Sequence, residues 1–401
     1  MSLLPVAEAQ SRLLALGKPT PVQAVPLAEA AGRWLAEPLV ARRDQPWHDL
    51  SAMDGYAIRF ADMPGPWRLT GAMAAGAIPD GASVEPGEAM RIFTGAPMPP
   101  GADCVLLQED VAAQGDHIRL TGEGPGGQGR HVRRRASDFA EGGALLSAGR
   151  QLGAPQLALA ALAGHAALPV HRAPRVAILS TGDELVPPGA PCPPGRLPAS
   201  NGIMLRAMIE RAGGTVIADT LVPDDLAALT AALGGAAGAD IIVTSGGASV
   251  GDHDLVRPAL DAAGGRIDFW RIAMRPGKPL IVGQLGQAVL LGLPGNPVSS
   301  LVTGALFLLP LIRHMGGAAD PLPRPTRARL GHAMPAVGGR TDYVRATVKD
   351  AIATPLDFQD SAAMRAAASA DALIIRPAGA PAAPAGDPVS ILPWASLGLA
   401  G

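Results

Sequence analysis

The sequence is poor in cysteine, and this shortage excludes two classes of structure. Its 401 residues include only Cys104 and Cys192, which lie far apart and form no CxxC pair. Two such cysteines supply neither a disulfide framework nor a thiolate metal site. If the protein handles a metal that prefers sulfur, the sulfur must come from a bound molecule.

The chain also lacks a large net charge of either sign. Thirty-three basic and thirty-five acidic side chains give a net charge of -2, so the broad positive field typical of nucleic-acid or membrane-surface binding is missing. The N-terminus shows no basic segment followed by an apolar core, and the most apolar run, 298–312, is too short to span a bilayer. We expect a soluble, cytoplasmic protein with no nucleic-acid or membrane partner, whose anion sites are local.

Lysine is almost absent, whereas glycine and proline are abundant. Only Lys18, Lys278 and Lys349 remain beside thirty arginines, so a lysine that persists in a loop carries extra weight. Fifty glycines and forty prolines predict many turns. Apolar residues make up 48% of the chain, which is enough for buried cores, and this length typically contains several domains.

The first 172 residues show two kinds of pattern. Apolar spacing predicts helices at 5–16, 27–35 and 154–163. Between them lie short β-prone pieces, separated by glycine and proline, at 67–69, 90–93 and 104–108. We therefore expect an elongated N-terminal linking domain, formed by 1–45 and 140–172, with an inserted β-rich lobe at 46–139.

The remaining residues predict an α/β domain followed by a β domain. Apolar strands are expected at 175–180, 216–222, 240–244, 267–272, 280–282 and 289–291. Helices alternate with them; one is capped by Ser200 or Asn201, and another is opened by Pro223 and Asp224. This alternation predicts a doubly wound, mostly parallel sheet at 173–318. Short β-type pieces after a proline-rich linker predict a small all-β domain at 319–401. The whole is thus a multidomain α/β protein.

In such sheets, ligands bind beyond the carboxyl ends of the strands. The loop SGGASVGDHD, 245–254, follows one predicted strand, and its glycines allow backbone N–H groups to approach an anion. Asp252 and Asp254 suit a phosphate that carries a hard divalent cation. The loop is neither a Walker loop nor a GxGxxG motif. A plain strand-to-helix turn, with one aspartate as N-cap, is the alternative.

Two further loops have the chemistry of a ligand site. GLPGNPVSS, 292–300, combines rigid prolines with Asn296 at a predicted helix start, although a structural cap explains the same pattern. MRPGKP, 274–279, carries Lys278, a compact charge suited to an anion, with Arg271 and Arg275 nearby. Either arginine is alternatively a solvated strand-end charge.

Carboxylates follow two other predicted strands. STGDEL, 180–185, and PDD, 223–225, place acidic side chains at the same expected sheet edge, although some of them equally suit caps. In the β-rich lobe, Asp54 and Gly55 form a pair that is first of all typical of a hairpin turn. The basic run RRRASD, 133–138, is either solvated or part of an oxyanion pocket.

Taken in order, seven motifs resemble the series found in the molybdopterin molybdenumtransferases, which include the gephyrin E domain. They are MDGYA, FTGAPMPPGAD, RRRASD, STGDEL, TSGGASVGDHD, MRPGKP and GLPGNPVS, and together they cover nearly the whole chain. The resemblance implies insertion of molybdate into adenylylated molybdopterin, with Mg²⁺-dependent hydrolysis of the adenylyl phosphoanhydride and release of AMP. It also implies a homodimer, in which the partner's lobe closes the cleft, and handover to other molybdenum cofactor proteins.

The resemblance and the loop chemistry together give a set of expected site residues. Catalytic roles are expected for Asp54, Glu184, Asp254 and Lys278. Magnesium ligands are expected among Glu184, Asp224, Asp225 and Asp254. Substrate binding is expected for Thr94, Arg133, Asp138, Ser245, Gly246, Gly247, Ser249, Arg271, Arg275, Pro294, Gly295, Asn296, Pro297, Arg345 and Ser361.

The sequence departs from the family pattern at several positions. Arg271 and Arg275 stand where lysine is often found, and the usual Gly-Glu-Asp reads Ala136, Ser137 and Asp138. Two other functions compete with the transferase. One is a molybdopterin-binding scaffold without turnover. The other is a nucleotide-dependent oxidoreductase, against which the missing GxGxxG motif counts.

Overall fold

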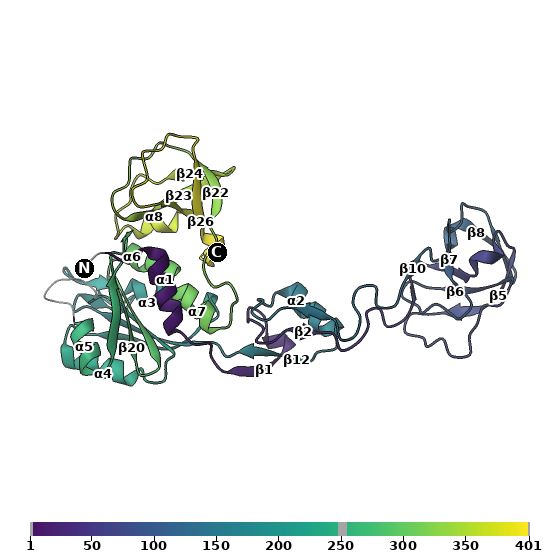
Figure 1. Cartoon of the computed structure of the whole chain (residues 1–401), viewed down its shortest axis with the longest axis horizontal. Helices are drawn as coiled ribbons and strands as arrows, with labels where there is room; N and C mark the ends of the chain where they lie inside the picture. Colours follow the sequence, from purple (N-terminus) through teal and green to yellow (C-terminus); the bar gives the residue numbers. More distant parts are fainter. Residues whose placement is uncertain (1–2, 248–254, 400–401) are drawn as a thin grey trace.

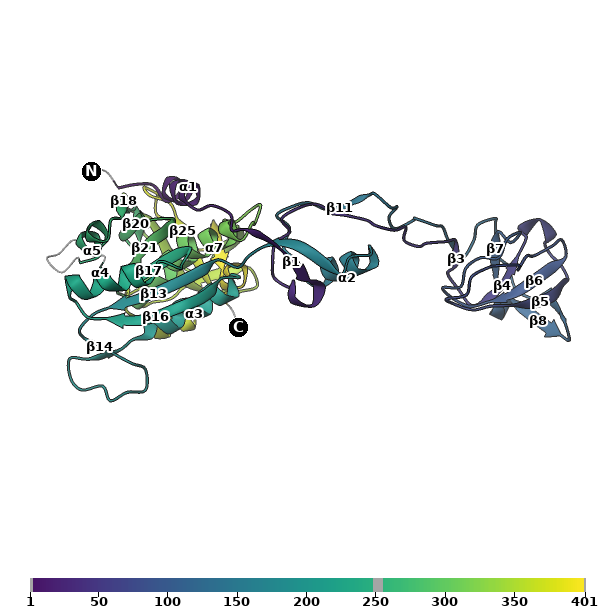
Figure 2. The ribbon, with the colours of Figure 1, turned by 90° about the horizontal axis from the view of Figure 1, so that it is seen from below.

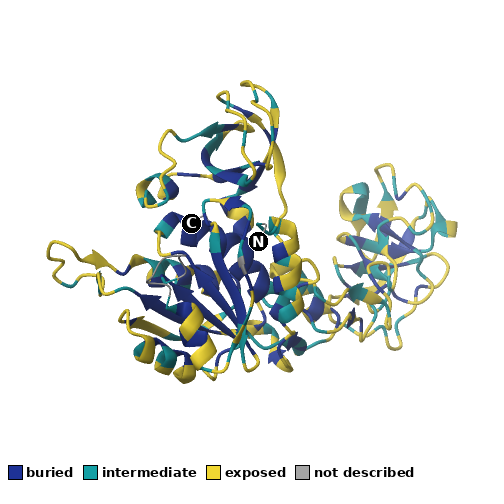
Figure 3. Cartoon of the chain, turned by 60° about the vertical axis from the view of Figure 1, so that its left-hand side comes forward, coloured by how far each residue is buried: buried dark blue, intermediate teal, exposed yellow. Residues whose placement is uncertain are grey.

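The computed structural model describes residues 3–247 and 255–399. Figure 1 shows an elongated chain, with the α/β domain and C-terminal barrel at one end, the β-rich lobe at the other, and a thin linking region between them. The same separation is seen in the perpendicular view of Figure 2. Large buried areas are confined to these separate parts, and the broadest is the sheet of the α/β domain (Figure 3).

The α/β domain is built on a six-stranded sheet. The strand order is β16 (Thr215–Val222), β13 (Arg175–Thr181), β17 (Ile241–Ser245), β21 (Ala288–Leu293), β20 (Pro279–Leu285) and β18 (Arg266–Arg271). The first four strands are parallel; β20 is antiparallel to both of its neighbours, so β18 again runs in the direction of the first four. The prediction of a mostly parallel sheet is confirmed.

Helices cover both faces of this sheet, because successive strand residues point to opposite sides. Val176 and Ile178 of β13 face a core formed with α1 (Val6–Leu16), α3 (Ser200–Arg211), α6 (Pro297–Thr303) and α7 (Leu309–Met315). Ala177 and Leu179 face the opposite core, formed with α4 (Leu226–Gly235) and α5 (Val256–Ala262). The domain is therefore wound on both sides, as expected.

One helix is long and apolar enough to cross a membrane by composition. It runs from Pro297 to Met315 through a π-helical segment, Gly304–Leu308, that joins α6 and α7. In its most apolar window, 89% of the helix is buried inside the structure. It is accordingly a core helix of the α/β domain.

The linking region corrects one prediction. It pairs β1 (Val22–Pro26) with β12 (Ala167–His171) and β2 (Leu39–Val40) with β11 (Ala144–Leu146), beside α2 (Ala154–Leu162). The expected helix at 27–35 is only a 3₁₀ turn, Leu27–Glu29. Gly32 has a φ of +76° and ends the turn, and Trp34 and Leu35 then form β-bridges to Gln151 and Val170. Pairing across the linking region overrides the local helical pattern.

The β-rich lobe contains a six-stranded sheet and a two-stranded ribbon. The sheet order is β7 (Cys104–Leu107), β4 (Gly55–Ile58), β6 (Glu88–Ile92), β5 (Trp67–Met73), β9 (His117–Leu120) and β8 (Val111–Gln114). The ribbon pairs β3 (Leu50–Ser51) with β10 (Val132–Arg133). The three predicted β-prone pieces lie in β5, β6 and β7.

The C-terminal part is a small barrel. Its strands are β23 (Thr341–Lys349), β24 (Ile352–Pro355), β22 (Thr326–Leu330), β26 (Pro388–Pro393) and β25 (Ala372–Arg376), and pairing of β25 with β23 closes it. The short strand β19 (Met274–Arg275), from the α/β domain, extends this sheet. The barrel also carries two short helices, α8 (Met364–Ala368) and α9 (Trp394–Leu397), which the all-β prediction did not include.

Two predicted helix starts are also corrected. The N-cap of α3 is Ala199, and neither Ser200 nor Asn201 caps the helix. The helix after β16 begins at Leu226, where the Asp225 carboxylate accepts a hydrogen bond of 2.8 Å from the N–H of Ala228. Both differences leave polar side chains at the carboxyl edge of the sheet.

Candidate functional site

Glycines bring three loops together at the carboxyl ends of β13, β17 and β21. A Cβ atom on Gly246, whose φ is +100°, would lie 2.4 Å from the carbonyl oxygen of Thr181. The N–H of Gly246 donates to the carbonyl oxygen of Leu293. A Cβ atom on Gly295 would lie 3.5 Å from the Cα atom of Gly246, so these two glycines are in close contact. No larger residue fits at Gly246. We call the surface formed by Thr181, Gly246, Gly247 and Gly295 the cradle.

Four hydroxyl groups that lack partners in the described part of the chain are buried at the ends of β13 and β17 and in α6. Ser180, Thr181, Thr244 and Ser300 are at most 5% exposed, and their side-chain oxygens have no hydrogen-bond partner among the described residues. The Thr181 hydroxyl is close to the Cβ positions of both Gly246 and Gly247. Because buried polar atoms in proteins are normally hydrogen-bonded, these groups suit a polar ligand.

Asn201 fastens two of the cradle loops to each other. Its Nδ2 donates to the Ser245 hydroxyl and to the Gly295 carbonyl, both at 2.8 Å. The sequence pattern indicated only a helix cap at this position. Its location in the first turn of α3, the helix that follows β13 in the chain, was the available signal for a positioning role.

Residues of the barrel reach the same edge. The Nδ2 atom of Asn296 donates to the Ser361 hydroxyl at 2.9 Å, and the N–H of Val298 donates to the Ser361 carbonyl at 3.0 Å. Arg345 is buried, and its guanidinium donates at 3.0 Å to the carbonyls of Phe358 and Asp360. Ser361 thus lies against the GLPGNP turn, on a loop that Arg345 holds in place.

The rigid turn itself lies at the start of α6. Pro294 precedes Gly295, Asn296 is the N-cap, and Pro297 is the first helical residue. The side chain of Asn296 makes no capping hydrogen bond, so its amide is engaged with Ser361 instead. Asn296 thus occupies the N-cap position of α6, as the structural alternative predicted, but its side chain does not cap the helix.

Carboxylates gather at the ends of β13 and β16. The Asp183 N–H donates to the Asp224 carboxylate at 3.3 Å, and the Asp224 N–H donates to the Asp183 carboxylate at 3.1 Å. The carboxylate of Glu184 folds back beside Gly182. Asp225 is occupied as the N-cap of α4. Within residues 3–247 and 255–399, no three acidic, histidine or cysteine side chains form a complete metal site.

Cations lie where the α/β domain meets the barrel. The Lys278 side chain is exposed and has no hydrogen-bond or ion-pair partner in the described part of the chain. Arg275, on β19, pairs with Asp342 of the barrel at 2.6 Å, and Arg271 is half-buried at the end of β18. Gly277, with a φ of +100°, packs against Thr303 of α6. The MRPGKP turn therefore lies beside the helix that begins at the cradle.

The β-rich lobe holds a second group of predicted residues. The Asp54 carboxylate accepts hydrogen bonds of 2.7 Å from both the N–H and the hydroxyl of Thr94. The N–H bond first, and then the hydroxyl bond, lower the pKa of Asp54 below its ordinary value. Gly55 does not form a hairpin turn; it lies in β4, where a Cβ atom would meet the Leu106 carbonyl at 2.0 Å.

The basic run beside Asp54 is partly neutralised. Arg134 pairs with Asp49, and Arg135 pairs with Asp44, each at 2.6 Å. Arg133 and Asp138 are exposed, and neither side chain has a hydrogen-bond or ion-pair partner among the residues that the structure describes. Since β10 pairs with β3, Arg133 lies opposite Leu50, close in sequence to Asp54. An unpaired cation thus remains for an oxyanion.

Ala136 occupies the left-handed backbone region in this loop, with a φ of +58°. Glycine adopts this conformation at the lowest cost, which explains why glycine is usual here in the resembling family. The departure at this position leaves the turn itself intact. The expected residues Ser249, Asp252 and Asp254 lie outside the described residues.

Comparison with known proteins decides the family. Three family models match in order: the MoeA N-terminal region (domain I and II) over residues 4–164, a probable molybdopterin binding domain over 177–314, and the MoeA C-terminal region (domain IV) over 327–394. A molybdopterin molybdenumtransferase 2 of Mycobacterium tuberculosis is 37% identical over 365 residues, 87% of this chain and 89% of the relative. The chain belongs to the molybdopterin molybdenumtransferase family.

Other members of the family agree with this. A molybdopterin molybdenumtransferase of Staphylococcus aureus is 31% identical over 401 residues, 97% of this chain and 95% of the relative. The crystal structure of a molybdopterin biosynthesis MoeA protein from Pyrococcus horikoshii superposes with a TM-score of 0.83 at 30% identity and covers 98% of this chain and 99% of its own. The expected family and fold class are confirmed.

Membership of the molybdopterin molybdenumtransferase family assigns the chain to molybdenum cofactor biosynthesis as a transferase. Its substrates are a molybdopterin compound and molybdate. The two cysteines, one buried and one exposed, are not joined to each other.

Proposed function

We propose that the chain inserts molybdate into adenylylated molybdopterin, hydrolyses the adenylyl phosphoanhydride with Mg²⁺, and releases AMP and the molybdenum cofactor. The observation that carries this proposal is the cradle, where glycine backbone and the unpartnered Thr181 hydroxyl lie at the carboxyl edge of the sheet. Backbone N–H groups and hydroxyls suit phosphate and pterin oxygens. The scaffold alternative accounts equally well for the cradle but gives the acidic edge no role.

The cradle loops have distinct roles in this proposal. Ser245, Gly246 and Gly247, with Ser249, hold the pterin and its phosphate. Pro294, Gly295, Asn296 and Pro297 form the opposite wall. Arg345 positions the loop of Ser361 through its contacts with two carbonyls. Asn201 holds the two walls at a fixed distance.

Lys278 and the neighbouring arginines form the cationic side of the site. Lys278 is the unpaired charge, whereas the charge of Arg275 is shared with Asp342. Arg271 adds a further cation at the end of the adjacent strand. We propose that Lys278 contacts molybdate, or the oxygen that attacks the phosphoanhydride. When the P–O–P bridge breaks, an oxygen of water or molybdate forms a bond to the molybdopterin-side phosphorus, and AMP leaves with the bridging oxygen. Where water attacks, its proton is lost to solvent.

The acidic edge fits a magnesium ion only together with the substrate. Mg²⁺ is typically held by one or two carboxylates plus substrate phosphates, and Glu184 and Asp224 supply two carboxylates near each other in the fold. Asp225 is engaged as an N-cap, so Asp224 is the better candidate of the two. Asp254 remains a predicted ligand. When bound, Mg²⁺ neutralises the charge of the diphosphate.

The remaining site residues lie in the lobe, at the opposite end of the chain from the cradle (Figure 1). We propose that Asp54, Thr94, Arg133 and Asp138 complete the cradle of a second copy in a homodimer. Arg133 offers an unpaired cation for molybdate, and Asp54 is held ionised by Thr94. We further propose a cytoplasmic location and handover of the product to other molybdenum cofactor proteins.

The test is release of AMP by the purified protein, supplied with adenylylated molybdopterin, molybdate and Mg²⁺. We expect release to depend on molybdate and on the cation, and to fall at least about a hundredfold in Asp54→Ala and Lys278→Ala. Normal binding of adenylylated molybdopterin without any AMP release would support the scaffold instead. Arg119→Gln, on the surface of β9, is the matched control.

A further inference from the structure

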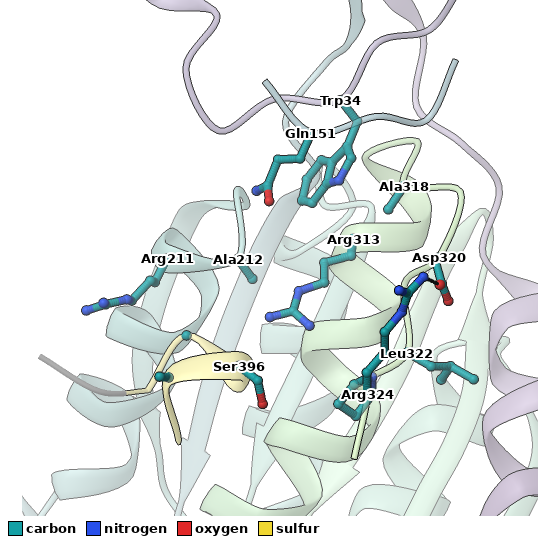
Figure 4. Close-up of a pocket in the computed structure, with 13 residues that line it drawn as sticks. Trp34, Gln151, Arg211, Ala212, Arg313, Ala318, Asp320, Leu322, Arg324 and Ser396 are labelled. Carbon is teal, nitrogen blue, oxygen red and sulfur yellow. Dashed lines mark hydrogen bonds and ion pairs between the residues drawn. The ribbon is translucent and has the colours of Figure 1, made fainter. Parts of the chain in front are cut away.

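A basic pocket of about 500 Å³ lies away from the cradle, at the far ends of α3 and α7 (Figure 4). Arg211 ends α3, and Arg313 lies in the last turn of α7. At about 1.5 Å per residue, Arg211 is ~15 Å along α3 from Asn201, which fastens the cradle. The pocket is therefore separate from the proposed catalytic site.

Three parts of the fold form the walls of this pocket. Trp34 and Gln151 come from the linking region, and Arg211 and Arg313 come from the α/β domain. Arg324 lies in the connection to the barrel, and Ser396 and Gly398 lie in and just after α9. A ligand bound here contacts every major part of the chain except the β-rich lobe.

Arg313 is a half-buried cation without an acidic partner. Figure 4 shows its side chain extending into the middle of the pocket, between Trp34 and Ser396. Its Nη2 atom donates to the Leu397 carbonyl at 3.0 Å. Burial lowers the pKa of Arg313, and no carboxylate among the described residues raises it again. The buried Arg345 differs, because the nearby Asp360 carboxylate partly offsets the lowering of its pKa. Buried charges in proteins are normally paired.

Arg211 approaches the same place from the other side. A Cβ atom on Gly398 would lie 3.7 Å from Cγ of Arg211 and 3.9 Å from Nη2 of Arg313, so the two side chains flank one glycine. In the described part of the chain, the Arg211 side chain has no hydrogen-bond or ion-pair partner. Its guanidinium is free to turn toward an anion.

The charge of the pocket lining is positive. Arg324 pairs with Asp320, and Asp320 is the one acidic residue among the lining residues. The carbonyl ends of α3 and α7 each add about half a negative charge near this end. Three full guanidinium charges outweigh these contributions.

Capping of their own helices, α3 and α7, does not account for these arginines; the Leu397 carbonyl to which Arg313 donates is at the C-terminal end of α9. The N–H groups of Ala212 and Gly316 already satisfy carbonyls in the last turns of α3 and α7. Arg313 contacts a carbonyl of α9 instead, and Arg211 contacts none of the described carbonyls. Their placement in one pocket thus calls for a different partner.

We propose that this pocket binds a phosphate monoester of nucleotide size between Arg211 and Arg313. It would be a second ligand site, in addition to the catalytic one and separate from it. Guanidinium groups match phosphate oxygens in a two-pronged geometry. The cavity is much larger than a bare phosphate and falls in the range usual for small organic ligands. This inference goes beyond the proposed function and does not depend on it.

Calorimetric titration of the full-length protein with AMP, without Mg²⁺, tests the inference. AMP is also the proposed product of the catalytic site, so Lys278→Gln serves as a second background. We expect Arg211→Gln/Arg313→Gln to weaken one AMP-binding event by about tenfold or more in both backgrounds. Arg119→Gln removes one exposed charge in the lobe and should leave that event unchanged.

Two further ligands establish which part of AMP is recognised. Adenosine should not bind this pocket, and inorganic phosphate should bind it more weakly than AMP. Arg211→Gln alone removes no contact made by the described residues, so it provides a folded variant that should also bind AMP more weakly. Equal AMP binding by Arg211→Gln/Arg313→Gln and Arg119→Gln, or equal binding of AMP and adenosine, would overturn the proposal.

Discussion

Hydrogen bonds from a single neighbour keep Asp54 ionised. Thr94 donates to its carboxylate through both its N–H and its hydroxyl, and these bonds lower the pKa of Asp54. A lowered carboxyl pKa contributes stability that is present above the unfolded-state value of about 3.9 and is lost as the pH falls through the folded-state value. Asp54 therefore remains charged in weakly acidic solution.

Removing the Thr94 hydroxyl should change how the activity depends on pH. In Thr94→Val one of the two hydrogen bonds is lost, so we expect the pKa of Asp54 to rise and the acid limb of AMP release to move to higher pH. Thr94→Ser retains the hydroxyl and should keep the wild-type profile. The measurement is the initial rate of AMP release as a function of pH, and identical profiles for the two variants would contradict this role.

Asn201 is a second residue whose side chain alone connects two parts of the site, the loops that carry Ser245 and Gly295. Asn201→Ala removes both hydrogen bonds between the cradle walls, and we expect about tenfold weaker binding of adenylylated molybdopterin. Ile203→Ala, an exposed position on the same helix, is the control. Equilibrium binding of adenylylated molybdopterin measures the effect. If both this affinity and the thermal stability are unchanged in Asn201→Ala, the two loops of the cradle do not depend on the Asn201 hydrogen bonds.

At the scale of elements, close backbone packing explains why glycine occupies β4. A Cβ atom on Gly55 would lie 2.0 Å from the Leu106 carbonyl of the paired strand β7, whereas a Cβ atom on Gly127 meets nothing within 4 Å. We expect Gly55→Ala to lower the free energy of unfolding of the lobe by about 3 kcal/mol. Gly127→Ala should change it little. Comparable denaturation midpoints for the two variants would rule out this packing argument.

Elements with strong periodic patterns could be predicted from the sequence. The strands of the α/β sheet and the helix at Val6–Leu16 agree with their apolar spacing. The helix expected at 27–35 failed because Trp34 and Leu35 pair with distant residues of the linking region, and local spacing contains no information on such pairing. The starts of α3 and α4 were misplaced because several adjacent polar residues were equally good caps.

The site was only partly predictable for the same reason. The sequence identified Asp54, Thr94 and the glycines of the cradle as candidates, and the structure shows what each contacts. The position of Asn201 at a helix start was a signal for a polar role, but its partners, Ser245 and Gly295, follow β17 and β21 and could not be read from the local pattern. The basic pocket at Arg211 and Arg313 was missed because its residues come from separate parts of the fold.

At the scale of the whole molecule, the predicted site is divided. The cradle, with Glu184 and Lys278 in the α/β domain, lies at one end, and Asp54, Thr94 and Arg133 lie in the lobe at the other (Figures 1 and 2). In the symmetric dimer that we propose, the lobe of one copy would complete the cradle of the other. Such a dimer contains two equivalent sites, each built from both copies.

Activity of mixed dimers tests this account most directly. Asp54→Ala disables the lobe half of the site, and Lys278→Ala disables the cradle half, so each variant alone should release almost no AMP. After subunit exchange at equal concentrations, half of the dimers are mixed and each has one intact site, so we predict about a quarter of the wild-type rate. Activity that stays at the level of the separate variants would contradict a catalytic site shared between two chains.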